Sequence, residues 1–501
     1  MSNLVAIVAS HYLLSKTSYM RGMQCAKALF LYRYYPQLRD PIPPSRMAAL
    51  NRGHDVGLMA RQLYPGGTDA TAGFGPRSAE ALERTRKLMD VGAEVIYEAA
   101  FVYNEVLVLA DIIVRNGQSW DVFEVKSSLR MSAANQQDAA LQYYVIRGSG
   151  VDVNELALIH LNGSYVRNGT LDLKQLFRKT SVLNFAKEQQ PMIEARIAEQ
   201  KQVLNSPQIP EISIGAKCFT PYVCDYFGNC WKNIPQPSVF DVAGISRAGQ
   251  DAFFTAGIRV PEQMPINAEI PPLAKLQITT RRSGVPFVNK EALKKYLNAL
   301  NCDLDFIDIE NFQPAVPRFA GTRPFMALPF AYSLHRRKAG ESETQHISFL
   351  AEPGADPRKA FIEQFLKDTT GENLILAYDI SAERYTLQQL VHTFPEYAAA
   401  LQQRLARLRD LMQPFSEGWY HHPAMNGSIS LKSVLPALVP ELSHAALAIQ
   451  NGNHAMAVYD QLHLETDMFA IEERKAELLE YCRLDTLAMV KIFEVLEEAA
   501  Q

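Results

Sequence analysis

Residues 105–127, EVLVLADIIVRNGQSWDVFEVKS, decide the fold of the first half of the chain. Two apolar runs rich in β-branched residues flank Asn116-Gly117, a dipeptide that accommodates the positive φ angles of a two-residue hairpin turn. With these two residues as the turn, Glu124 lies one diagonal step from Asp111 on the neighbouring strand. Side chains two residues apart share a face of the sheet, so Lys126 points the same way. The sequence therefore predicts two carboxylates and a lysine that converge at one end of a short hairpin.

Such an arrangement suits metal-dependent chemistry. Two carboxylates at diagonal spacing can hold one Mg²⁺ or Mn²⁺ ion between them. A lysine beside them can orient an attacking water or offset the charge that builds on a phosphate. The alternative is a surface hairpin in which Asp111 and Glu124 reach solvent, with Lys126 as their exposed partner.

The wider context resembles a nuclease family. The pattern Asp111-x12-Glu124-x-Lys126 resembles the core of the PD-(D/E)xK nuclease superfamily. His54 and Gln142 stand where its RecB-like members carry a histidine metal ligand and a glutamine. The resemblance implies a metal bound by His54, Asp111 and Glu124. It also implies that Lys126 acts on the water or the phosphate and that Gln142 supports the substrate or the metal.

Two positions near this motif stay open. At Ile146 the family pattern expects a tyrosine, and Tyr143 or Tyr144 is close enough in sequence to substitute. Glu98, in a strand-like run before the hairpin, is either a further metal-site acid or a surface residue.

Length and composition describe a globular chain. Its 501 residues are enough for two or three domains, and 48% of them are hydrophobic and 21% charged. The net charge of −4 gives no global signal for nucleic acid, so a binding groove must be a local basic patch. The candidates, each of which is otherwise a solvated charge run, are Arg178-Lys179, Arg281-Arg282 and His335-Arg336-Arg337-Lys338.

No targeting signal is expected from the sequence. It contains no run of about 18 apolar residues, which predicts no transmembrane helix and no membrane partner. The N-terminus, MSNLVAIVASHYLLSK, has no basic start and no clear cleavage site, so no signal peptide is expected. We therefore expect a cytoplasmic protein whose six cysteines are reduced.

Four cysteines form a second candidate site. Cys218, Cys224 and Cys230 follow one another with five residues between neighbours, and Cys25 lies far upstream in an expected helix over residues 20–35. This spacing does not fit the short CxxC knuckles of common zinc ribbons, whereas four thiolates are the usual complement of a [4Fe–4S] cluster. Zinc (Zn²⁺) and a plain set of buried cysteines stay open as alternatives. The arrangement resembles the iron–sulfur RecB-like nucleases, including the CRISPR-associated and AddB types, in which one early and three late cysteines bracket the nuclease core.

The last third of the chain carries a third candidate site. Asp308 and Glu310 alternate on one face of a buried-looking strand, and Tyr481 and Asp485 lie one helical turn apart. With Glu383 after a second apolar strand, this order resembles the DEDD family of 3′–5′ exonucleases on an RNase H-like fold. The resemblance implies that the four acids bind two metal ions and that Tyr481 positions the attacking water.

This third site departs from the family pattern at two positions. Glu383 stands where most members carry an aspartate, and Asp379 stands where an asparagine commonly precedes it by four residues. A longer acid still binds metal but shifts the ligand, which can leave the site slow or inactive. The alternative is an α/β domain whose acids are ordinary strand-end residues.

Together these features predict an α/β protein with a PD-(D/E)xK restriction-endonuclease-like domain and an RNase H-like domain. The expected domains span residues 1–234 and 301–501, with a small helical connector over 235–300. The expected function is metal-dependent hydrolysis of DNA phosphodiester bonds at ends or on single strands, in repair, recombination or phage defence, with RNA left open as a substrate.

Two other interpretations compete with the nuclease. One is a nucleic-acid-binding scaffold subunit with one or both sites inactive, working through a partner helicase or a defence complex. The other is a regulator that uses the cluster as a redox switch. If only one nuclease site is inactive, the anomalies at Glu383 and Asp379 favour the C-terminal one.

Overall fold

The structure, a computed structural model, describes residues 12–73, 75, 79–267, 269–444 and 447–501. The chain folds into two compact units, each of which mixes helices with sheets, as the predicted α/β class requires. The first unit contains residues 1–233 and 315–325, and the second contains residues 234–314 and 326–501. Among the described residues, none of the helices combines the length and the apolar character that crossing a bilayer requires.

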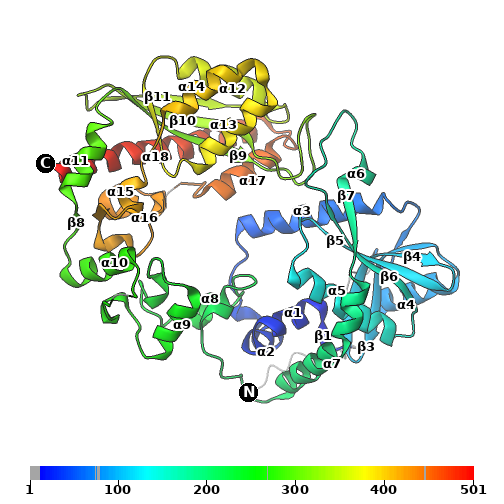
Figure 1. The fold of residues 1–501 in the computed structure, drawn as a ribbon. Coiled ribbons are helices and arrows are strands. Elements are labelled where there is room, and N and C mark those ends of the chain that lie inside the picture. The colour runs from blue at the N-terminus through cyan, green and yellow to red at the C-terminus, as the bar shows by residue number, and fades with distance from the viewer. Residues whose placement is uncertain (1–11, 74, 76–78, 268, 445–446) are drawn as a thin grey trace. The chain divides into compact units, whose positions relative to one another are not determined.

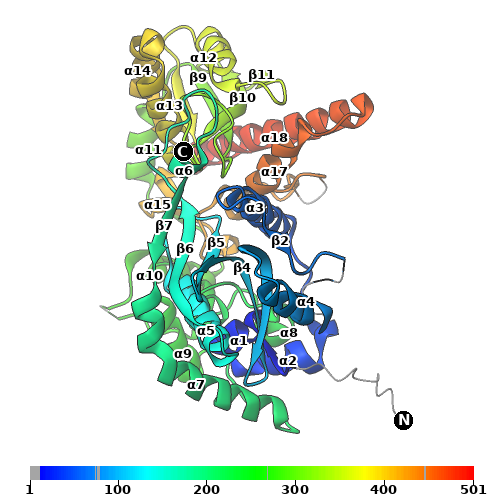
Figure 2. The same cartoon turned by 90° about the vertical axis from the view of Figure 1, so that its right-hand side faces the viewer.

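The first unit is built on a seven-stranded sheet (Figure 1). Six of its strands follow the order β2-β3-β4-β5-β6-β7, and the seventh, β1, pairs with β4. Its strands are β1 (Leu14–Ser15), β2 (Thr68–Asp69), β3 (Val95–Tyr103), β4 (Val106–Asn116), β5 (Ser119–Lys126), β6 (Val153–Leu161) and β7 (Phe177–Ser181). Strands β3, β4 and β5 pair antiparallel, whereas β5 and β6 pair in parallel. The parallel pair is joined by helix α5 (Ala133–Gly148), which packs back onto the sheet (Figure 2).

The β4–β5 hairpin forms as predicted, but its turn lies one residue further along the chain. Asn116 pairs with Ser119, so the two-residue loop is Gly117-Gln118 and not Asn116-Gly117. Gly117 has a φ of 61°, whereas the second loop residue, Gln118, does not have a positive φ. The turn therefore requires a positive φ at one residue only, and glycine supplies it. The register therefore moves by two residues. Because side chains alternate with a period of two, the predicted face of each acid is unchanged.

Helices cover this sheet and carry several of the predicted site residues. They are α1 (Lys16–Gln24), α2 (Ala26–Tyr34), α3 (Pro44–Arg61), α4 (Ala79–Asp90), α6 (Leu173–Leu176), α7 (Leu183–Asn205) and α8 (Phe227–Trp231), besides α5. Ser15 caps α1 by accepting a hydrogen bond from the backbone of Ser18. The single helix expected over residues 20–35 is wrong, because Cys25 is extended, with a φ of −162°, and divides it into α1 and α2.

The second unit contains a five-stranded sheet with the order β11-β10-β9-β12-β13 and a two-stranded ribbon of β8 and β14. These strands are β8 (Phe287–Val288), β9 (Leu304–Phe312), β10 (Leu328–Arg337), β11 (Thr344–Leu350), β12 (Leu374–Ala377), β13 (Leu408–Asp410) and β14 (Tyr420–His421). The helices are α9 (Arg247–Thr255), α10 (Pro272–Ser283), α11 (Lys290–Asn298), α12 (Pro357–Asp368), α13 (Ser381–Thr393), α14 (Ala398–Arg407), α15 (Gln413–Ser416), α16 (Leu431–Leu438), α17 (Gly452–Leu462) and α18 (Met468–Ala500).

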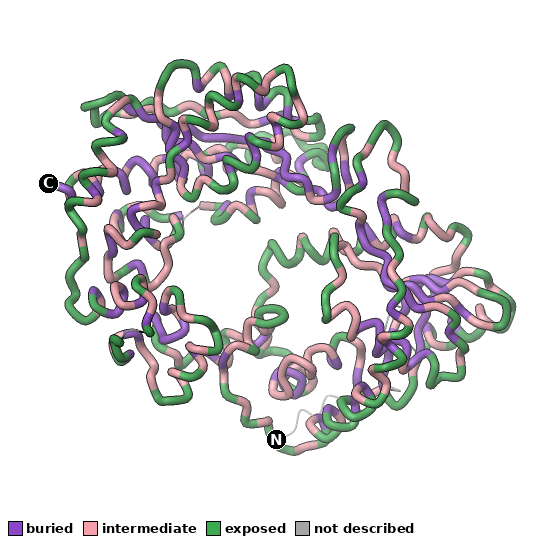
Figure 3. The backbone as a smooth tube through the Cα atoms, viewed as in Figure 1, coloured by how far each residue is buried: buried purple, intermediate pink, exposed green. Residues whose placement is uncertain are grey.

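Most residues of the central strand β9 are buried, and the backbone in Figure 3 is coloured by this burial. Leu304 and Phe306 point to the face covered by α18, where they meet Phe493. Ile307 and Ile309 point to the opposite face, covered by α12 and α13. This alternation decides which helix each acid of β9 can meet.

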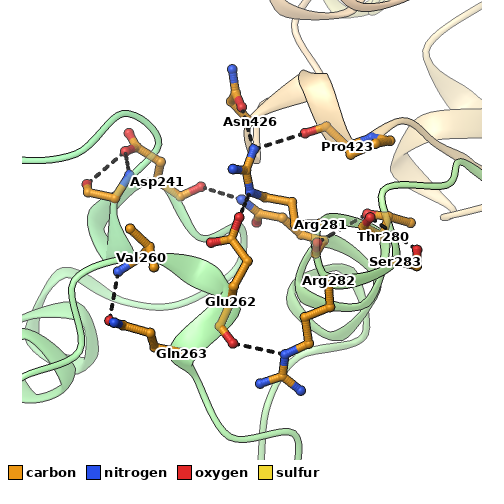
Figure 4. Close-up of polar contacts among 12 residues, drawn as sticks. Asp241, Val260, Glu262, Gln263, Thr280, Arg281, Arg282, Ser283, Pro423 and Asn426 are labelled. Atoms are coloured by element: carbon orange, nitrogen blue, oxygen red, sulfur yellow. Dashed lines mark hydrogen bonds and ion pairs between the residues drawn. The ribbon is translucent and has the colours of Figure 1, made fainter.

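The segment expected as a connector is fixed to the rest of the second unit (Figure 4). Arg281, on α10, donates hydrogen bonds to the carboxylate of Glu262 at 2.5 Å and to the side chain of Asn426 at 3.1 Å. The neighbouring Arg282 donates to the carbonyl oxygen of Glu262 at 2.9 Å. Both arginines, offered by the sequence as a basic patch, therefore make internal contacts.

Candidate active sites

The first unit brings the predicted acids and lysine together at the β4–β5 hairpin. The register continues past Ile112–Phe123 so that Asp111, on β4, lies beside Glu124, on β5. One oxygen of Asp111 accepts the backbone N–H of Val125 at 2.6 Å, which fixes its carboxylate against β5. Only 2% of the surface of Glu124 is exposed, so its charge needs partners inside the protein.

Three donors supply that compensation. Glu124 Oε1 accepts from Lys126 Nζ at 2.5 Å and from Lys16 Nζ at 2.8 Å, whereas Oε2 accepts from Gln142 Nε2 at 2.7 Å. Lys126 also donates to Asp138 at 2.7 Å. Asp138 and Gln142 lie one turn apart on α5, which the βαβ connection places next to β5. Sequence reasoning singled out Gln142 and Lys126 but missed Lys16 and Asp138.

The surroundings shift the pKa values of Asp111 and Glu124 in opposite directions. Burial raises the pKa of Asp111 well above its usual range, and the neighbouring carboxylate of Glu124 adds to the rise. Burial acts in the same direction on Glu124, but the ammonium groups of Lys126 and Lys16 outweigh it and lower the pKa of that acid. Glu124 is therefore the acid that stays ionised, and Asp111 holds its proton more tightly.

A cavity of about 1060 Å³ adjoins these residues. Asp111, Glu124 and Lys126 line one side of it. One face of α3 lines another, with residues three or four apart: Arg46, Leu50, His54, Gly57 and Arg61. His54 thus shares the cavity with the two acids, as predicted. Among the described residues, however, the group close enough to hold a metal ion as it stands is in the second unit, and His54, Asp111 and Glu124 do not form such a group.

Glu98 lies across from Asp111 in the register of β3 and β4 and lines the same cavity. Its φ of 50° is rare for a residue with a side chain, and its carboxylate pairs with Arg61 at 2.9 Å. Burial raises the pKa of Glu98 despite this partner. Tyr143 and Tyr144, the two candidates for the expected tyrosine, are not among the described residues that line this cavity.

The four predicted cysteines lie together in the same unit, around a small void of about 20 Å³. The break between α1 and α2 places Cys25 against the later segment that holds Cys218, Cys224 and Cys230. Burial raises the pKa of Cys224 to about 11, and the other three thiols add to the rise. Four thiols gathered in this way can serve as ligands of a zinc ion or of an iron–sulfur cluster.

Asp225 connects the cysteines to the cavity. It follows Cys224 directly, and its side chain is only 5% exposed. Its carboxylate pairs with three arginines, namely Arg21, Arg39 at 3.0 Å and Arg46 at 2.6 Å. Arg46 lies on α3, so the helix that carries His54 is anchored beside the cysteines.

The second unit gathers three predicted acids at the centre of its sheet. Asp308 and Glu310 continue the row of Leu304 and Phe306 toward α18, and Asp485 lies on that helix. Among the described residues, these three acids are the group whose ligand atoms all lie within 4.8 Å of one another. Burial raises the pKa of Asp308 and of Glu310, and the carboxylate of Asp485 adds to both shifts. Such mutual repulsion favours a bound cation.

Glu383 and Tyr481 stand at the edge of this acid group. Glu383, at the start of α13, is 4% exposed, and burial raises its pKa to about 8. One of its oxygens has no hydrogen-bond partner among the described residues. The hydroxyl of Tyr481 contacts the carboxylates of Glu310 and Asp485, and burial raises its pKa.

Two further residues at the acid group were missed by sequence reasoning. His444 lies 2.8 Å from Asp485 Oδ1 through its Nε2 atom and is 8% exposed. Lys432, the second residue of α16, has its ammonium 5.5 Å from the centre of the Tyr481 ring, close enough for its charge to act on the three acids. No local pattern in the run 426–436 indicates which of its residues reaches the acids.

The remaining basic runs differ in how far they are engaged inside the protein. Arg336 pairs with Asp305 at 2.8 Å, and Arg337 pairs with Glu497 at 2.6 Å. Lys179, on β7, lies 4.9 Å from the centre of the Phe123 ring and is exposed together with Arg178. Arg336 and Arg337 therefore make internal contacts, whereas Arg178 and Lys179 face solvent.

Comparison with known proteins adds one match. The family model described as "Domain of unknown function (DUF2779)" matches residues 305–430. The match includes Asp308, Glu310 and Glu383 and ends before α16 and α18. No curated protein matches the chain.

Proposed function

We propose that the protein is a metal-dependent nuclease that hydrolyses phosphodiester bonds of DNA at ends or on single strands. The observation that carries this proposal is the close approach of Asp308, Glu310 and Asp485, whose ligand atoms lie within 4.8 Å of one another in a partly buried setting. Acids brought this close repel one another unless a proton or a cation lies between them. Oxygen ligands at such spacing suit Mg²⁺ or Mn²⁺.

The residues of the second unit fit that metal. Asp308, Glu310 and Asp485 would hold it, and the unpartnered oxygen of Glu383 is a further ligand for a second ion. Bound metal would supply a nucleophilic water and offset the charge of the phosphate. Tyr481, held by Glu310 and Asp485, orients the water, and His444 fixes Asp485. We further propose the RNase H-like class for this unit.

The first unit supports a second site of the same chemistry on a PD-(D/E)xK-like domain. Asp111 and Glu124 would share a metal, His54 would reach it across the cavity, and Lys126 faces the same space. Two buried acceptors, Asp138 Oδ1 and Gln142 Oε1, have no hydrogen-bond partner among the described residues, so the site has spare capacity for a cation.

We propose that the four cysteines hold a [4Fe–4S] cluster that stabilises the first unit. The gathering of all four thiols around one void supports the proposal, because four thiolates are the usual complement of such a cluster. Protein purified without oxygen is then brown, and Cys25→Ser loses iron. A colourless preparation that contains zinc refutes this part of the proposal.

A cleavage assay tests the nuclease proposal. Wild type, Lys126→Ala and Asp308→Ala are incubated with Mg²⁺ or Mn²⁺ and either linear end-labelled or circular single-stranded DNA. Lys201→Ala is the matched control, because Lys201 forms an ion pair with Glu105 at 2.7 Å away from both sites. Loss of cleavage in Lys126→Ala alone assigns the activity to the first unit, and loss in Asp308→Ala alone assigns it to the second. If wild type cuts neither DNA with either metal, the scaffold interpretation replaces the nuclease.

A further inference from the structure

Lys16 is an unexpected member of the first site. It opens α1, where a lysine normally reaches solvent, yet its side chain is only 26% exposed. Its ammonium lies 2.8 Å from Glu124 Oε1 and 3.7 Å from Asp138 Oδ2. The residue is 108 positions from Glu124 in sequence, so tertiary packing alone brings the two together.

The donors around Glu124 oppose metal binding through their charge. Oε1 already accepts from two ammonium groups, and Oε2 accepts from a buried amide. These donors take three of the about four acceptor sites of the carboxylate, and a divalent cation at the fourth would lie beside two ammonium groups. Departure of one ammonium group therefore favours metal binding.

Lys16 is the donor that moves at least cost. Lys126 has a second anchor, because it also donates to Asp138 at 2.7 Å, and Gln142 is fully buried on α5. Among the described residues, the second contact of Lys16 is longer, at 3.7 Å from Asp138. The side chains of the two lysines are similarly exposed, 26% for Lys16 and 23% for Lys126, so this difference in the second contact decides which one moves.

The charges of the site give the displaced ammonium a second partner. A divalent metal adds two positive charges beside the ammonium groups of Lys16 and Lys126. A phosphodiester group of the substrate brings a negative charge to the same place. The second ammonium is thus matched by the phosphate and not by the acids.

We propose that Lys16 occupies the metal position on Glu124 in the metal-free protein and moves to a substrate phosphate oxygen when the metal binds. This inference rests on the metal-dependent nuclease function proposed for the first unit. Lys16 is then both a competitor of the metal and a ligand of the substrate. Removing it must affect metal binding and cleavage in opposite directions, which loss of a merely structural ion pair does not do.

Metal affinity, measured without DNA, is the decisive readout. Mn²⁺ is titrated calorimetrically into the full chain carrying Asp308→Asn, which weakens the second site, so that the first site dominates the signal. Lys16→Met, which keeps the aliphatic stem, is expected to bind Mn²⁺ about tenfold more tightly, because it removes one competing charge from a desolvated carboxylate. Lys16→Arg keeps the charge and should bind like the parent, as should Lys201→Ala.

Cleavage by the same variants, with Asp308 restored, completes the test. Lys16→Met should cut single-stranded DNA at least about tenfold more slowly at saturating Mn²⁺, whereas Lys16→Arg retains most of the rate. Unchanged or weaker Mn²⁺ binding by folded Lys16→Met overturns the inference, and so does absence of Mn²⁺ binding to the Asp308→Asn parent. If the parent binds Mn²⁺ and Lys16→Met binds it more tightly, but wild type cuts no DNA, the competition stands and the nuclease function fails.

Discussion

Replacing Glu383 by glutamine is expected to stabilise the metal-free protein at alkaline pH. Glu383 is 4% exposed, and its pKa is raised from 4.5 to about 8, first by burial and then by Asp379 and Glu310. Each tenfold change in acidity corresponds to about 1.4 kcal/mol, so ionising this carboxyl in the folded protein costs on the order of 4–5 kcal/mol. Glutamine has the shape of the protonated acid and avoids that cost.

The sign of the pH dependence follows from the two states. Between pH 4.5 and about 8 the folded protein keeps a proton on Glu383 that the unfolded chain has released. The stability of wild type therefore falls as the pH rises through this range and stays low above it. Glu383→Gln does not share this loss, so the two proteins are similar near pH 4.5 and differ most at pH 9.

Thermal unfolding in EDTA measures the difference. At pH 9 the transition of the second unit should rise by roughly 10 °C in Glu383→Gln, from about 2–4 °C per kcal/mol for a unit of this size. Glu341→Gln is the control, because Glu341 is exposed in the turn between β10 and β11. Saturating Mn²⁺ should stabilise wild type more than Glu383→Gln. A variant no more stable than wild type in EDTA at pH 9 refutes the reasoning.

Three further changes probe other parts of the molecule. Asp225→Ala leaves three arginines without their buried partner, so it should destabilise the first unit by about 3–5 kcal/mol and lower its iron content. Thermal melts and an iron assay measure the two effects, and a melting temperature equal to that of wild type contradicts the prediction. Gly427→Ala should cost the second unit more than about 2 kcal/mol, because the added carbon lies 1.8 Å from the carbonyl oxygen of Asp241 and φ is 80°; urea unfolding no different from wild type argues against it. Tyr481→Phe should slow cleavage by about 10²-fold with an unchanged KM, and a rise in KM alone would assign the hydroxyl to substrate binding.

Much of each candidate site follows from periodicity within single elements. Asp308 and Glu310 share a face because strand side chains alternate, and Tyr481 and Asp485 share a face because four residues make about one helical turn. The same alternation kept Asp111 beside Glu124 although the hairpin turn lies one residue away from the predicted position. These placements depend on local geometry, so the sequence predicts them without knowing the rest of the fold.

The sequence by itself therefore determined the α/β class, the two acid groups and the four cysteines as a set. Only the tertiary structure decided that Lys16 shares the carboxylate of Glu124, that His444 contacts Asp485, and that several arginine runs serve internal contacts. It also decided that the first helix breaks at Cys25. The physical reason is that these features join segments far apart in the chain, and the direction in which a side chain finds its partner is set by packing, which no local pattern contains.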